Sequence, residues 1–229
     1  AECQPLKDVH IRIEPRVVAR GGESQLTCYY DLEGAALYSV KWYRGRYEFY
    51  RYTPHENPET KIFTLKGLTV NVSNSNGTHV LLNNIDFNVS GNFTCEVTTD
   101  APYFSTATDT QTMLVVELPE YPPTISVSRE PLDYGDTLRA NCSCSPSRPR
   151  ATLTFYLNDI MVGRTVAATG RELQETAWSD LRLELPLERF HFRGDGRLEL
   201  RCVAEIEDAY RDEAVLRLSS AREPVPERG

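Results

Sequence analysis

Apolar and polar residues alternate along the chain in short runs, which is the pattern of β-strands with one buried face. In the N-terminal half, Val9, Ile11 and Ile13 alternate with polar residues, and Leu26 and Cys28 share one face of the next run. Prolines, glycines and short polar stretches separate the runs, since they do not continue a strand. The pattern therefore predicts an all-β protein built from many short strands.

The same alternation returns in the C-terminal half, where leucines occupy every second position of two runs, at Leu181, Leu183, Leu185 and Leu187 and then at Leu198 and Leu200. Between the halves, three prolines form a short connector, and proline-rich linkers are stiff and extended. We therefore predict a first domain over residues 1–118, a linker over 119–123, a second domain over 124–220 and a polar tail over 221–229.

A cysteine pair with a tryptophan between its members marks the first domain. Cys28, Trp42 and Cys95 follow one another at the spacing of an immunoglobulin-type sandwich, in which the tryptophan packs on a disulfide between two sheets. The long interval from Trp42 to Cys95 has room for an extra pair of strands, which favours a variable-type topology. Phe93 stands where such domains carry the tyrosine of the tyrosine corner, so that hydrogen bond is lost while the core can still be filled.

The second domain has its own cysteine frame, Cys142 to Cys202, with Phe155 where a tryptophan is usual. The fold class is thus two tandem immunoglobulin-like β-sandwiches, and the preferred disulfides are Cys28–Cys95 and Cys142–Cys202. Cys3 and Cys144 remain. A bond between them is geometrically doubtful, because they belong near opposite ends of their domains. The alternatives are a bond to another chain or to residues outside this sequence.

Glycosylation sequons indicate the compartment. Asn-X-Ser/Thr occurs at Asn71, Asn76, Asn88, Asn92 and Asn141, and sugars are attached there only in the secretory pathway. The predicted disulfides also indicate an extracellular protein, because disulfides persist in oxidising environments. We recognise neither a signal peptide nor an apolar run of the ~20 residues that span a bilayer. We therefore expect an extracellular protein, secreted or anchored at the cell surface, with no membrane anchor visible in this chain.

Composition excludes several functions. The 229 residues have a hydrophobic fraction of 40%, enough for two small cores, and a net charge of −8, which argues against nucleic acid as the partner. The six cysteines lack metal-ligand spacing, so we expect no metal and no cofactor. The four histidines are scattered and no catalytic motif occurs, so we expect neither an enzyme nor a small-molecule substrate.

The hairpin over residues 38–52 carries the candidate chemistry. Because Trp42 faces the core, Lys41 and Tyr43 should face outward, and a turn at Gly45 should continue that surface into a second strand. Tyrosine and arginine, which are enriched at interface hot spots, dominate this surface. The alternative is a well-packed strand pair, since tyrosine and phenylalanine favour strands. The predicted partner-binding residues are Lys41, Tyr43, Arg46, Tyr47, Phe49, Arg51, Glu96, Thr98, Tyr103 and Phe104.

Six segments of the chain are distinctive. Those in the first domain are LKDVHI (6–11), YDLEGAALYSVKWYRGRYEFYRYTPHENP (30–58), SGNFTCEVTTDAPYF (90–104) and VVELP (115–119), and those in the second are GDTLRANC (135–142) and GDGRLELRCVA (194–204). These segments closely resemble the beaten path (Beat) family of arthropod neuronal immunoglobulin-superfamily proteins. Phe155, which many members have as tryptophan, and Cys144 depart from the family pattern.

This resemblance implies a neuronal recognition protein that binds a Sidestep-family cell-surface protein and acts in axon guidance or synaptic partner recognition. It also implies that variable-type first domains meet face to face through the sheet that holds the hairpin. Two other classes remain open. One is a homophilic cell-adhesion molecule that uses the same sheet, and the other is a secreted enzyme or enzyme inhibitor, which would need a polar cleft.

Overall fold

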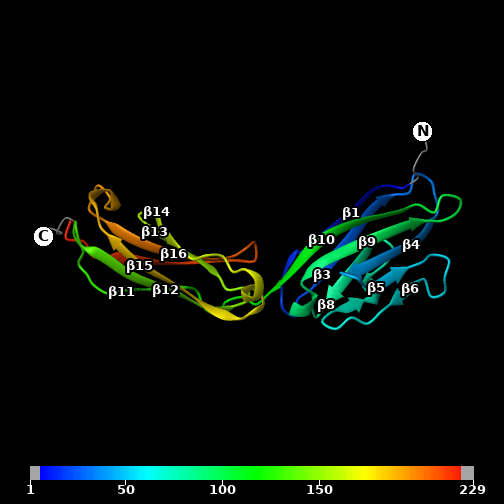
Figure 1. Cartoon of the computed structure of the whole chain (residues 1–229), viewed down its shortest axis with the longest axis horizontal. Coiled ribbons are helices and arrows are strands. Elements are labelled where there is room, and N and C mark those ends of the chain that lie inside the picture. The colour runs from blue at the N-terminus through cyan, green and yellow to red at the C-terminus, as the bar shows by residue number, and fades with distance from the viewer. Residues whose placement is uncertain (1–5, 223–229) are drawn as a thin grey trace, which may run out of the picture. The chain divides into compact units, whose positions relative to one another are not determined.

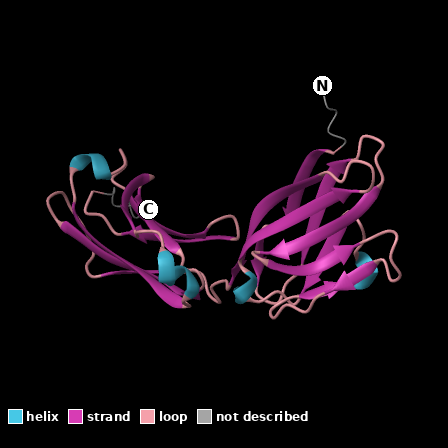
Figure 2. Cartoon of the chain, turned by 45° about the vertical axis from the view of Figure 1, so that its right-hand side comes forward, coloured by secondary structure: helices cyan, strands magenta, loops and turns pink. Residues whose placement is uncertain are grey.

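A computed structural model describes residues 6–222. The chain divides into two compact units between Val116 and Glu117, and each unit is a sandwich of two β-sheets (Figure 1). Figure 2 shows that the helices are short and lie in connections between strands. No helix among residues 6–222 is long and apolar enough to span a bilayer. The predicted fold class, tandem immunoglobulin-like sandwiches, is confirmed.

The first unit has the variable-type arrangement. One sheet has the strand order β1-β3-β8-β7, and the other has the order β2-β10-β9-β4-β5-β6, with the extra strands β5 and β6 beside β4. The strands are β1 (Lys7–Glu14), β2 (Val17–Ala19), β3 (Ser24–Asp31), β4 (Leu37–Arg44), β5 (Tyr47–Tyr52), β6 (Thr60–Ile62), β7 (Thr69–Asn71), β8 (His79–Asn83), β9 (Gly91–Thr99) and β10 (Thr106–Val116). Short 3-10 helices η1 (Val72–Asn74) and η2 (Phe87–Val89) flank β8.

The second unit has fewer strands. A three-stranded sheet, β11-β12-β15, packs on a four-stranded sheet, β14-β13-β16-β17. The elements are β11 (Thr124–Val127), β12 (Thr137–Ser147), β13 (Thr152–Leu157), β14 (Ile160–Arg164), η3 (Gly170–Gln174), β15 (Ala177–Pro186), η4 (Arg189–His191), β16 (Leu198–Ile206) and β17 (Tyr210–Leu218).

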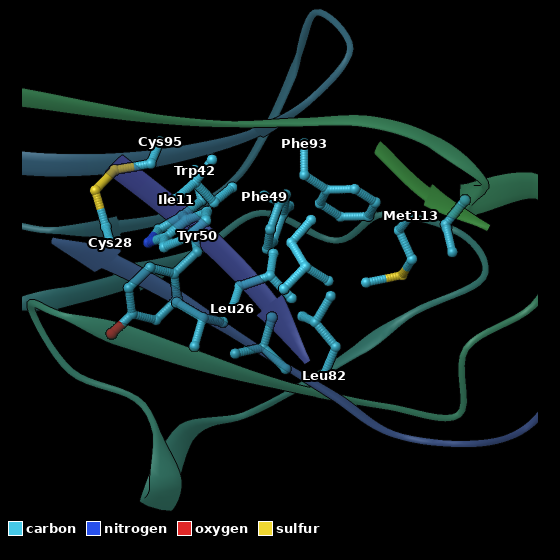
Figure 3. Packing of buried hydrophobic residues seen from close by; sticks show 14 of the residues in the cluster. Ile11, Leu26, Cys28, Trp42, Phe49, Tyr50, Leu82, Phe93, Cys95 and Met113 are labelled. Carbon is cyan, nitrogen blue, oxygen red and sulfur yellow. A yellow bond between two sulfur atoms is a disulfide. The ribbon is translucent and has the colours of Figure 1, made fainter. Parts of the chain in front are cut away.

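The core of the first unit is organised around a disulfide between its sheets. Cys28 of β3 is bonded to Cys95 of β9, and the Trp42 ring lies beside this bond (Figure 3). Phe93 contacts the edge of the Phe49 ring, with ring centroids 5.9 Å apart. Phe93 thus fills the core, as its place in the sequence suggests. The predicted Cys28–Cys95 bond is confirmed.

The second unit repeats this frame with a different aromatic residue. Cys142 of β12 is bonded to Cys202 of β16, as predicted, and Phe155 is fully buried. Cys144 is a free, buried thiol, and burial and the nearby Asp212 carboxylate raise its pKa. In the folded unit this sulfur is inaccessible to a second chain. Cys3 lies outside the described residues.

Side chains of β10 close the open edge of the first unit. The backbone N–H of Ile11 donates to Oδ2 of Asp109 at 2.9 Å, and that of Ile13 donates to Oε1 of Gln111 at 3.1 Å. These oxygens take the place of a neighbouring strand, because unpaired backbone donors at a partly buried edge are costly. The same carboxylate lies 3.2 Å from Nδ1 of His10. Two residues of β10 thus join the two sheets.

We expect Phe49→Ala to lower the free energy of unfolding of the first unit by about 3–5 kcal/mol, because the ring is fully buried. Tyr47→Ala, two positions away, should change it by no more than about 0.5 kcal/mol, since Tyr47 is 70% exposed. Urea unfolding followed by Trp42 fluorescence measures this in a Trp178→Phe background, in which the second tryptophan, 60% exposed, is removed. Equal losses for the two variants would contradict the assignment.

The Asp109 carboxylate should make the first unit sensitive to acid. Burial raises its pKa, but hydrogen bonds from the N–H groups of Ile11 and Thr110, together with His10, outweigh burial and lower the pKa overall. Because the pKa of Asp109 is lower in the folded state, its carboxylate stabilises the fold fully above the unfolded-state pKa of about 4. This stabilisation is lost as the pH falls through the folded-state pKa.

Asp109→Asn should therefore cost about 1–2 kcal/mol at pH 7, since an amide has one acceptor oxygen for two N–H donors. The difference from wild type should shrink at pH 3, measured by the same Trp42 fluorescence. A difference that is equal at both pH values would rule out this role.

Candidate functional site

The outward side chains of the six-stranded sheet form one continuous surface, which we call the six-strand face. Strand pairing aligns them in rows. One row crosses five strands and consists of Thr108, Glu96, Lys41, Arg51 and Lys61. A second row consists of Thr110, Thr94, Tyr43 and Glu48. Trp42 is fully buried, so the alternation of β4 places Lys41 and Tyr43 on this face, as the sequence predicts.

The charged residues at the centre of the face neutralise one another. Nζ of Lys41 lies 3.8 Å from Oε1 of Glu96, and the Tyr43 hydroxyl donates to the same oxygen at 3.4 Å. The guanidinium of Arg51 makes two hydrogen bonds to the Glu48 carboxylate, at 2.6 and 2.9 Å. The centre is therefore a set of pre-formed ion pairs. A partner can cover it without facing an isolated charge.

Threonines extend the face over β9 and β10. The hydroxyls of Thr94 and Thr110 are 2.8 Å apart, and those of Thr98 and Thr106 are 3.0 Å apart. Cross-strand threonine pairs of this kind stabilise a sheet. Their short side chains also leave this part of the face flat.

Strongly exposed aromatic residues stand at both ends of the sheet. Tyr47, 70% exposed, follows the β4–β5 turn and pairs with Arg44, so alternation puts its side chain on the side opposite Tyr43, at the hairpin tip rather than on the face. Tyr103 and Phe104, 57% and 64% exposed, stand in the β9–β10 loop. These places are opposite ends of the sheet, because β4 and β9 are antiparallel: Arg44 pairs with Phe93, and Leu37 pairs with Thr99. Phe104 has a φ of 47°, which is unusual for a bulky residue and marks a strained loop that holds an apolar ring in solvent.

The structure corrects one predicted site residue. Phe49 was placed on the outward surface by simple alternation, but it is fully buried. The register of β4 and β5 shifts between Trp42, which pairs with Tyr50, and Tyr43, which pairs with Glu48. This irregularity leaves Phe49 and Tyr50 both in the core and puts Glu48 on the face. No sequence signal fixes the position of such a bulge, so Glu48 was missed.

The other predicted residues are accessible. Arg46 and Tyr47 are at the hairpin tip, and Tyr103 and Phe104 stand in the β9–β10 loop. The remaining five are on the six-strand face: Lys41, Tyr43, Arg51, Glu96 and Thr98. Sequence reasoning also missed Lys61 and the β10 threonines. Alternation along β10 is the only signal for the threonines, and Lys61 is in the short strand β6.

Four of the sequons belong to the first unit. Asn92 is exposed on the outward side of β9, where its Oδ1 accepts a hydrogen bond from Thr112 at 2.8 Å. A glycan on Asn92 would border the Arg44 end of the six-strand face. The other three sequons are in or near the four-stranded sheet of the first unit, at Asn71 in β7, Asn76 in the β7–β8 connection and Asn88 in η2.

Comparisons with known proteins identify the fold. No family model and no curated protein matches the chain. The crystal structure of murine CEACAM1b is similar, with a TM-score of 0.65 and 19% identity over 93% of this chain and 100% of that one. The chain has a tandem immunoglobulin fold. At this identity the likeness shows the fold alone.

A crystal structure of a mouse coronavirus receptor-binding domain complexed with its murine receptor also matches, with a TM-score of 0.58 and 18% identity over 92% of this chain and 98% of that one.

We expect the Tyr43 phenol to titrate late. Burial, then the Glu96 and Glu48 carboxylates, raise its pKa to about 12. A raised pKa favours the neutral phenol, so this contribution to stability is present below the ordinary pKa near 10 and is lost as pH rises through about 12. Carbon NMR of protein labelled at tyrosine Cζ would follow the titration, and Tyr43→Phe assigns the signal. Glu96→Gln should lower the midpoint; an unchanged midpoint would refute the coupling.

Proposed function

We propose that this chain is the extracellular part of a recognition protein whose first unit binds another immunoglobulin-superfamily protein through the six-strand face. The observation that carries the proposal is the layout of that face, with neutralised charges at its centre and exposed aromatic rings beside it, in the β9–β10 loop at one end and at the hairpin tip at the other. Tyr103 and Phe104 are adjacent in the β9–β10 loop, and adjacent exposed rings of this kind are typical of protein-interaction sites. We propose no catalytic role.

Two kinds of contact would act in such a complex. The aromatic rings would supply buried area, as tyrosines do at interface hot spots. The central ion pairs would set orientation and partner choice, because a partner that breaks the Lys41–Glu96 or Arg51–Glu48 pair without replacing it leaves a buried charge. Affinity and specificity would thus come from different parts of the same face.

The resemblance to the beaten path family supports a more specific proposal. We propose that the partner is a Sidestep-family cell-surface protein and that the complex acts in axon guidance or synaptic partner recognition. The segment with the densest resemblance, residues 30–58, includes β4 and β5, which are central to the six-strand face. Disulfides in both units agree with an extracellular location.

A homophilic adhesion molecule is the second candidate, and one observation favours it. The ion-paired residues at the centre of the face balance in sign, with Lys41 and Arg51 against Glu96 and Glu48. Two copies can therefore meet across a two-fold axis without net repulsion. Sedimentation of the whole chain at high concentration separates this candidate from the first.

Tyr47→Ala should weaken binding to a Sidestep-family ectodomain at least tenfold, about 1.4 kcal/mol, measured by surface plasmon resonance on the whole chain. A Tyr103→Ala, Phe104→Ala double variant should weaken it similarly. Tyr121→Ala is the matched control, because Tyr121 is 61% exposed but belongs to the second unit. Wild-type affinity in both first-unit variants would contradict a partner that contacts the hairpin tip and the β9–β10 loop.

A further inference from the structure

The three-stranded sheet of the second unit carries a shallow groove on its outward side. Strand pairing puts Ser126 of β11, Asn141 of β12 and Arg182 of β15 in one row. The serines of β11 are short, whereas β15 carries long side chains, so the surface is lower over β11. The groove has a volume of about 290 Å³, and its polar lining consists of Ser126, Ser128, Arg139, Asn141, Arg182 and Glu184.

Asn141, a predicted glycosylation site, lines this groove and has unusual hydrogen bonding. Its Nδ2 donates to Oγ of Ser143, the hydroxyl residue of the same sequon, at 3.0 Å. Ser143 donates in turn to Oδ1 of Asp180 at 2.5 Å. Oδ1 of Asn141 is buried and accepts no hydrogen bond from the described residues. A buried acceptor of this kind is costly unless a donor reaches it.

We propose that an N-glycan on Asn141 seats its first N-acetylglucosamine in this groove and stabilises the three-stranded sheet. In forming the linkage, Nδ2 of Asn141 bonds to C1 of the sugar and loses one proton. The C1–oxygen bond to the pyrophosphate of the lipid-linked oligosaccharide donor breaks, and the lipid pyrophosphate leaves. The proposal rests on the extracellular location in the proposed function, since only the secretory pathway supplies this donor.

The lining suits a sugar ring. The Arg139 guanidinium lies 3.4 Å from the Glu184 carboxylate, and this pair borders the groove with donors and acceptors for sugar hydroxyls. Val127 and Leu183 border the groove through their backbone, because both pair with Ala140 in the core-facing row, so the outward lining is polar. The volume is near the lower end of the ~300–1,000 Å³ range of small-ligand sites, which fits one saccharide unit rather than a chain.

The test uses the whole chain secreted from animal cells. Glycopeptide mass spectrometry should find carbohydrate on Asn141. Hydrogen exchange should then show the amides of residues 124–128 exchanging at least about tenfold faster in Ser143→Ala, which loses the sequon, than in wild type. Ser143→Thr keeps the sequon and should match wild type. Trimming every glycan to a single N-acetylglucosamine should leave the protection unchanged.

Two controls separate the glycan from other effects. Asp180→Ala removes the hydrogen bond of Ser143 but keeps the sequon, so it should retain protection over residues 124–128. Asn92→Gln removes an exposed sequon of the first unit and should not alter exchange in the second.

An unmodified Asn141 in a chain whose other sequons carry sugar would overturn the proposal, as would wild-type exchange in Ser143→Ala. Neither result bears on partner binding by the first unit, so the two proposals fail independently.

Discussion

The contact between Trp42 and the Cys28–Cys95 disulfide is the constraint on which the first unit depends. The disulfide fixes the separation of the two sheets, and the indole fills the space beside it. Once Trp42 is inside, the alternation of β4 leaves Lys41 and Tyr43 outside. The six-strand face is therefore a direct consequence of how the core is packed.

The centre of that face is charged but internally neutralised, and exposed aromatic rings stand beside it at the hairpin tip and in the β9–β10 loop. Burying an unpaired charge costs several kcal/mol, so pre-formed pairs make the centre cheaper to desolvate. In the proposed complex the aromatic rings would supply the favourable burial, so a flat, charged sheet would need no deep pocket.

The second unit uses the same disulfide frame for a different surface. Phe155 takes the place of the tryptophan, and the sheet that contains β13 lacks the extra strand that β6 adds in the first unit. Its three-stranded sheet presents serines, asparagine and arginine, with the exposed ring of Trp178 near the start of β15. The two units therefore share a core design but differ in the chemistry of their outward faces.

Local patterns in the sequence determined much of this. Alternation gives the strands, the order Cys28, Trp42, Cys95 gives the fold and the disulfide, and the parity of Trp42 gives the outward positions of β4. The tertiary structure alone decided the rest. The register shift between Trp42 and Tyr43 buries Phe49 and exposes Glu48. The sequence does not reveal this shift, because it depends on how β5 packs against the opposite sheet. Likewise, Asp109 meets Ile11 only when both sheets have formed, since contacts between residues so distant in sequence leave no local periodic signal.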